Sequence, residues 1–176
     1  MKDSQLDENL RTLRGDFDRS FAVAVAERDV KPLDFLTIRI AADPYALRLS
    51  EVASLHSERR LVVAPSPLLE LCGFASFRGI LTPVYDLGAL LGYPRGTTKN
   101  RLVVVQWSSP IAFAFETLEA HVRVSAGQVS QTDRGRNGAV VGALRDQGRT
   151  VPLLHLPSLV EGIAQRIKAI GPSQER

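Results

Sequence analysis

The spacing of the apolar residues limits the possible folds of this chain more than any other feature. From Asp34 onward, apolar residues alternate with others, as Leu36, Ile38 and Ile40 do with the residues between them. A period of two is typical of β-strands that bury one face. Turn-forming residues interrupt these runs about every 8–12 residues, a spacing typical of small β-sandwiches and β-barrels. We therefore expect a mainly β fold of about eight to ten short strands rather than a parallel α/β sheet.

The clearest hairpin lies in the second half of the chain. Residues 102–107 and 111–118 flank a turn, and the bulky Phe113 and Phe115 are expected on the face opposite to Ala112. The other predicted strands cover 35–41, 45–49, 61–63 (short and buried), 74–77, 80–85, 121–124, 139–144 and 150–156. Pro83 inside 80–85 indicates an edge or a bulge. Residues 125–138 are polar and rich in turn formers, so we expect a loop there.

Helices are expected at the margins of the β region. A helical turn is predicted at 87–91, and Pro157 suits the first turn of a final helix. The stripe of this helix consists of Leu159, Ile163 and Ile167.

The first 33 residues have a different pattern. Their apolar residues have the spacing of an amphipathic helix: Leu6, Leu10, Leu13, Phe17 and Phe21. Such a helix either packs on the domain's own core or binds a partner through Leu6, Leu10, Leu13 and Phe17. We therefore divide the chain into a helical extension, 1–33, and a domain with a C-terminal helix, 34–176.

Composition indicates the compartment and excludes some partners. A transmembrane helix needs about 20 apolar residues, and the longest run without a charged residue, 102–115, is shorter. Cys72 is the single cysteine, which excludes a disulfide scaffold. We expect a cytoplasmic protein without direct membrane insertion. The net charge of +3 comes from scattered Lys and Arg, a pattern that does not favour nucleic-acid binding.

No motif for catalysis, metal or cofactor binding is recognisable. Nucleophile-elbow, phosphate-loop and dinucleotide-binding patterns are absent from the sequence. His56, His121 and His155 lack the spacing of metal ligands, and we expect structural roles for them. Cys72 lies among apolar residues, as a small buried hydrophobe does. We expect neither an enzyme nor a bound cofactor or metal.

One region is unusually rich in glycine and proline. Residues 65–92 contain seven of them around apolar residues, a composition that usually fixes an irregular backbone. Arg78 lies there between Phe77 and Gly79. It is either an exposed turn residue or an anchor at a protein interface, where arginine is enriched.

The stretch 34–92 resembles the CheW-like domain, an adaptor of bacterial chemosensory arrays. The residues that carry this resemblance are the strand at 35–41, Tyr45-Ala46-Leu47, Val52, Pro65, Gly73, Phe77-Arg78-Gly79 and Pro83-Val84-Tyr85-Asp86-Leu87. The resemblance extends over about 34–164, less specifically toward the end. Many members of the family have Glu where Ser54 stands, Asn where Ser76 stands and Asp where His155 stands.

The resemblance implies two intertwined five-stranded SH3-like β-barrels around a shared core, without catalysis. It also implies two partners, a methyl-accepting chemoreceptor's cytoplasmic tip and the regulatory domain of a CheA-type histidine kinase. The expected partner-binding residues are Val52, Ser54, Gly73, Phe77, Arg78 and Gly79. The protein would be cytoplasmic and recruited to membrane-associated receptor arrays.

Three functions remain open from the sequence. The first is a chemosensory adaptor that couples receptor to kinase. The second is the same adaptor in a non-flagellar system that controls pili or a second messenger, which the N-terminal extension would suit. The third belongs to another class, a basic small-barrel nucleic-acid-binding protein.

Overall fold

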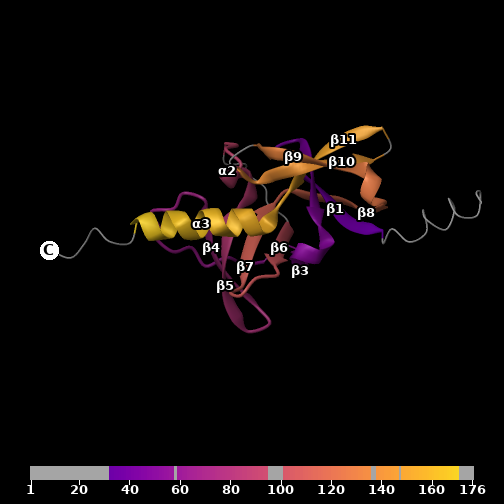
Figure 1. The fold of residues 1–176 in the computed structure, drawn as a ribbon. Coiled ribbons are helices and arrows are strands. Elements are labelled where there is room, and N and C mark those ends of the chain that lie inside the picture. Colours follow the sequence, from indigo (N-terminus) through magenta and orange to yellow (C-terminus); the bar gives the residue numbers. More distant parts are fainter. Residues whose placement is uncertain (1–31, 58, 95–100, 136–137, 147, 171–176) are drawn as a thin grey trace, which may run out of the picture. The chain divides into compact units, whose positions relative to one another are not determined.

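The computed structural model describes residues 32–57, 59–94, 101–135, 138–146 and 148–170 (Figure 1). The chain divides into two units, Met1–Pro32 and Leu33–Arg176, and the description below concerns the second. The N-terminal stripe Leu6, Leu10, Leu13, Phe17 and Phe21 lies outside the described residues. Within the described ranges, no helix combines the length and the apolar character needed to span a membrane.

The strands form two sheets. The first is six-stranded, in the order β8-β1-β2-β11-β10-β9. Its strands are β1 (Leu33–Ile40), β2 (Asp43–Arg48), β8 (Thr117–Val124), β9 (Val129–Gly135), β10 (Val140–Asp146) and β11 (Arg149–Leu154). The second is five-stranded, in the order β3-β6-β7-β5-β4. Its strands are β3 (Val52–Ser57), β4 (Leu71–Phe77), β5 (Ile80–Asp86), β6 (Arg101–Val105) and β7 (Ile111–Phe115).

Among the described residues, helical elements lie between these strands and after the last one. They are η1 (Leu49–Glu51), α2 (Leu87–Leu90), η2 (Ala126–Gln128) and α3 (Leu156–Ile170). The helical turn α2 begins where the Asp86 side chain accepts a hydrogen bond from Ala89 N, an N-cap that satisfies a free amide of the first turn. Figure 1 shows α3 as the long yellow helix after β11.

The two sheets are built from interleaved parts of the chain. β1 and β2 belong to the six-stranded sheet, β3 to β7 form the five-stranded sheet, and β8 to β11 return to the first. Each sheet contains one parallel pair, β2 with β11 and β5 with β7. The expected mainly β architecture and the C-terminal helix are therefore confirmed.

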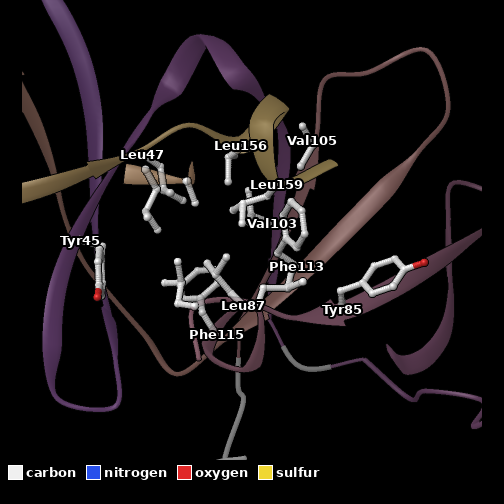
Figure 2. Close-up of a cluster of buried hydrophobic side chains, with 14 of the residues drawn as sticks. Tyr45, Leu47, Tyr85, Leu87, Val103, Val105, Phe113, Phe115, Leu156 and Leu159 are labelled. Atoms are coloured by element: carbon white, nitrogen blue, oxygen red, sulfur yellow. The ribbon is translucent and has the colours of Figure 1, made fainter. Parts of the chain in front are cut away.

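The main core lies where both sheets meet α3. Figure 2 shows Leu47 from the first sheet, Phe113 and Phe115 from the second, and Leu159 from α3 in one cluster. Phe113 and Phe115 are at most 1% exposed. Burying such a side chain contributes about 1.5–3 kcal/mol, so this cluster joins the two sheets and the helix into one folding unit.

The two faces of β7 confirm the alternation predicted for residues 111–115, whereas residues 117–118, predicted in the same strand, begin β8 of the other sheet. Phe113 and Phe115 belong to the main core, whereas Ala112 and Ala114 belong to a second cluster. That second cluster also contains Phe77 of β4 and Val104 of β6. Small residues on this face leave room for larger side chains from the neighbouring strands.

Several local predictions need correction. The six-stranded sheet has one strand more than each five-stranded barrel implied by the resemblance. Residues 125–138, expected to be a loop, contain η2 and β9. β9 lies at the edge of its sheet, where a strand can be polar because one side of its ladder is open to solvent.

Residues 61–63 do not form the predicted buried strand. Val62 makes one isolated bridge with Phe74, and Val62 and Val63 are 65% and 80% exposed. In α3, Leu159 and Ile163 are buried, but Ile167 is 49% exposed because the helix continues beyond the main core cluster. Pro83 lies just before Val84, where pairing of β5 with β7 begins, so one side of its backbone needs no ladder partner there.

Candidate partner-binding site

The β4–β5 turn holds Arg78 at an exposed tip. Phe77 pairs with Ile80, so Arg78 and Gly79 form a two-residue loop. Both have positive φ, 52° at Arg78 and 82° at Gly79, as a type I′ hairpin turn requires. Glycine accepts this conformation freely, whereas a residue with a Cβ loses about 1 kcal/mol. The turn therefore keeps a strained arginine where Asn or Asp would fit better.

Side chains of β3 and of Arg59, which follows that strand, lie beside Phe77 at the base of this turn. The ring centroids of His56 and Phe77 lie 4.7 Å apart, with an interplanar angle of 49°. The guanidinium carbon of Arg59 lies 5.7 Å from the Phe77 ring centroid. Ser54 Oγ is 2.9 Å from His56 Nε2, and Arg59 Nη2 is 3.4 Å from His56 Nδ1. We call Ser54, His56, Arg59, Phe77 and Arg78 the β3–β4 face.

The β3–β4 face has a positive electrostatic environment. Partial burial lowers the pKa of His56, and the charges of Arg59 and Arg78 lower it further. Among the residues that the structure describes, no carboxylate forms an ion pair with Arg59 or Arg78. At neutral pH the face therefore carries two guanidinium groups around a neutral imidazole.

Gly73 is buried and lies against the backbone of a neighbouring segment, residues 61–63. Its φ is +141°, and an added Cβ would lie 2.5 Å from the carbonyl oxygen of Val62. Val62 and Phe74 exchange two backbone hydrogen bonds of 2.8 and 2.9 Å beside it. Because Gly73 is buried, its absent side chain allows residues 61–63 to approach β4.

The structure brings together some of the predicted site residues and separates others. Ser54, Phe77 and Arg78 belong to the β3–β4 face, and Gly79 completes the turn. Val52 lies at the start of β3 and packs against the main core. His56, for which the sequence predicted a structural role, and Arg59, which no sequence pattern indicated, are the additional residues of this face. Ser54 and His56 are two residues apart, so on a strand their side chains lie on the same face. This spacing is the sequence signal that could have placed His56 beside Ser54.

A model of the CheW-like domain matches residues 34–164. The chain belongs to the CheW-like domain family. A solved structure with a similar fold is that of the scaffolding protein TtCheW from Thermoanaerobacter tengcongensis, with a TM-score of 0.69 and 15% sequence identity. The match covers 74% of this chain and 94% of that one. Among curated protein sequences, none matches this chain.

Family membership defines the general role of this CheW-like domain. The family consists of scaffold and adaptor proteins of chemotaxis signalling. The chain is thus assigned to signal transduction by protein–protein interaction, in agreement with the adaptor role implied by residues 34–92.

The other two histidines of this CheW-like domain are found in separate polar contacts. His155 Nδ1 lies 2.8 Å from Ser158 Oγ at the start of α3, and its Nε2 lies 3.8 Å from Glu51 Oε1. His121 Nε2 is 2.9 Å from Asp34 Oδ1. His155 is not in the apolar strand position that we expected, since it follows β11 and its side chain is 37% exposed. No cluster of three or more candidate metal ligands occurs within the described ranges.

Glu51, the last residue of η1, links the segment between β2 and β3 to α3 in the same domain. Its Oε2 accepts a hydrogen bond of 2.9 Å from Leu156 N, at the first turn of α3. Burial raises the pKa of this carboxyl, although the Leu156 amide, His155 and Arg48 oppose that rise. A carboxylate at a helix N-terminus stabilises the helix. Glu51 therefore has a structural role, because it holds the start of α3 against the segment before β3.

Proposed function

We propose that this CheW-like domain couples the cytoplasmic tip of a chemoreceptor to the regulatory domain of a CheA-type histidine kinase by binding both. The observation that carries the proposal is the exposed Arg78 on a strained two-residue turn. Family membership supports it. A strained residue persists when the surrounding structure holds it in place, and such residues concentrate at functional sites.

Arg78 would fix the position of the receptor on the domain. Its turn is supported by Phe77, which is 6% exposed and belongs to the second core cluster. A rigid base reduces the conformational entropy that Arg78 loses on binding. Individual contacts with receptor and kinase can then be weak, because an array raises their effective concentration.

The barrel architecture is part of this proposal. β3 and β4 are the two outer strands of the five-stranded sheet, yet His56 of β3 contacts Phe77 of β4. This contact supports curling of the sheet into an SH3-like barrel. We further propose a domain boundary near residue 33, a cytoplasmic location with recruitment to receptor arrays, and partner binding by the N-terminal segment.

A titration of the full chain tests the function. Two ligands from the same cell are used, a receptor cytoplasmic-tip fragment and the kinase regulatory domain. We expect micromolar binding of both, and Arg78→Ala should weaken receptor binding by about tenfold while circular dichroism stays unchanged. Arg145→Ala, an exposed arginine of β10, is the matched control and should bind as the wild type does.

Two results would contradict the proposal. The coupling role is wrong if neither ligand binds at about 100 μM while the chain is folded, because the proposal expects micromolar binding of both. The anchor role of Arg78 is wrong if Arg78→Ala binds the receptor fragment as tightly as Arg145→Ala does.

A further inference from the structure

The β3–β4 face combines two arginines, Arg59 and Arg78, that have no carboxylate partner among the described residues. Elsewhere in the described ranges, four arginines pair with carboxylates of the same chain: Arg39 with Glu119, Arg48 with Glu51, Arg123 with Asp34 and Arg166 with Glu70. In those ranges Arg60, Arg145 and Arg149 form no such ion pair either. What distinguishes the β3–β4 face is that two arginines without an ion pair to a described carboxylate lie close enough to the same imidazole, that of His56, for both charges to act on it.

Two contacts within the face restrict the Arg59 side chain. Its guanidinium lies over the Phe77 ring and contacts His56 Nδ1. A guanidinium is planar and holds its N–H donors in a fixed fork, which suits a carboxylate. Because the contacts with Phe77 and His56 already restrict the Arg59 side chain, less entropy is lost when it binds an anion.

We propose that the β3–β4 face binds an acidic segment of a protein partner, with Arg59 as a second anchor beside Arg78. This inference rests on the proposed function, because it specifies the chemistry of the partner at the same site. Carboxylates of Asp or Glu would supply the charge that both guanidinium groups lack within the domain.

Protein carboxylates fit this face better than nucleic acid does. Single-stranded nucleic acid binds where exposed aromatic rings stack on bases. Phe77, the aromatic residue of the face, is 6% exposed, and its ring already contacts His56 and Arg59. The face thus offers charge and hydrogen-bond donors without a free stacking surface.

The test compares three probes by titration of the full chain at low salt. They are a 16-residue helical peptide rich in Glu, the same peptide with Gln in place of Glu, and a single-stranded RNA. We expect the Glu peptide to bind at least tenfold tighter than the Gln peptide and the RNA, and to lose most of this affinity at high salt. Its binding should perturb the NMR signals of residues 54–57 and 77–79.

Substitutions then assign the binding to the face. Arg59→Gln and Arg78→Gln should each weaken Glu-peptide binding by about fivefold, whereas Arg145→Gln should leave it unchanged. Equal binding of the Glu and Gln peptides overturns the inference, as does tighter binding of RNA or an unchanged affinity in both Arg59→Gln and Arg78→Gln.

The receptor-tip fragment separates this inference from the proposed function. If the fragment binds and Arg59→Gln has no effect on it or on the Glu peptide, the coupling function stands and the second anchor is wrong. If the Glu peptide binds through Arg59 and Arg78 but neither the receptor fragment nor the kinase domain binds, the inference stands and the coupling function is wrong.

Discussion

Replacing Gly73 by alanine should destabilise the domain through its backbone. A Cβ at this position would lie 2.5 Å from the carbonyl oxygen of Val62 and 3.3 Å from Val63 Cα. Backbone atoms cannot rotate away as the end of a flexible side chain can. Residues 61–63 must therefore move from β4, or β4 must change its conformation at φ +141°.

The magnitude follows from the contacts that would be lost. Moving residues 61–63 breaks the two hydrogen bonds between Val62 and Phe74, each worth about 0.5–1.5 kcal/mol. Alanine at φ +141° is strained whether or not these residues move, at an additional cost of about 1–3 kcal/mol. We expect a loss of about 2–6 kcal/mol in the free energy of unfolding, and a decrease in Tm of about 4–24 °C for a domain of this size.

Thermal and urea unfolding followed by circular dichroism measure this loss, with three glycine variants as controls. Gly142→Ala should behave similarly, since its Cβ would lie 2.2 Å from Ser130 O. Gly138→Ala has a positive φ of 73° but open space, so about 1 kcal/mol should be lost. Gly162→Ala, in α3 with open space, should stabilise by up to about 1 kcal/mol.

One result would refute this reasoning. A Gly73→Ala protein with wild-type Tm, while Gly138→Ala shows its small loss, would mean that residues 61–63 can leave β4 without cost. The bridge of Val62 to Phe74 would then contribute nothing to stability. Weaker receptor binding by such a stable variant would instead give Gly73 a direct role at the partner surface.

Three further predictions concern charged and capping groups. Burial raises the pKa of Glu51 above its usual 4.5, so the folded domain binds a proton more tightly than the unfolded chain does. The free energy of unfolding should therefore fall as the pH rises from 4.5 through the raised pKa. Urea unfolding of Glu51→Gln should not show this fall. Burial and the charges of Arg59 and Arg78 lower the pKa of His56 below 6.5. Lowering the pH from 7 to about 5.5 should therefore add positive charge to the imidazole and tighten binding of the Glu peptide. Titrations of His56→Gln should show no such gain. Asp86→Ala should lower the free energy of unfolding in urea by about 0.5–2 kcal/mol, because Ala89 N loses its cap, and a wild-type midpoint would exclude that role.

The sequence by itself determined many of the local elements of this domain, although not β3 or β9. A strand's alternation depends on which face each residue buries, so Phe113 and Ala112 could be placed on opposite faces without knowing the neighbouring strands. The loop of Arg78 and Gly79 was also recognisable as an exposed turn. α2 followed from the residues around Leu87, and most of α3 followed from Leu159 and Ile163.

Only the tertiary structure decided which strands pair and which side chains meet. The parallel pairing of β2 with β11 joins residues far apart in the chain through backbone groups that every sequence has. The apolar residues at 61–63 predicted a buried strand from local composition alone. In the fold, Val62 makes one isolated bridge with Phe74 beside Gly73, and its side chain remains exposed. His56 and Phe77 meet although they lie on opposite edges of one sheet, because their contact depends on how that sheet curves and not on any local period of the sequence.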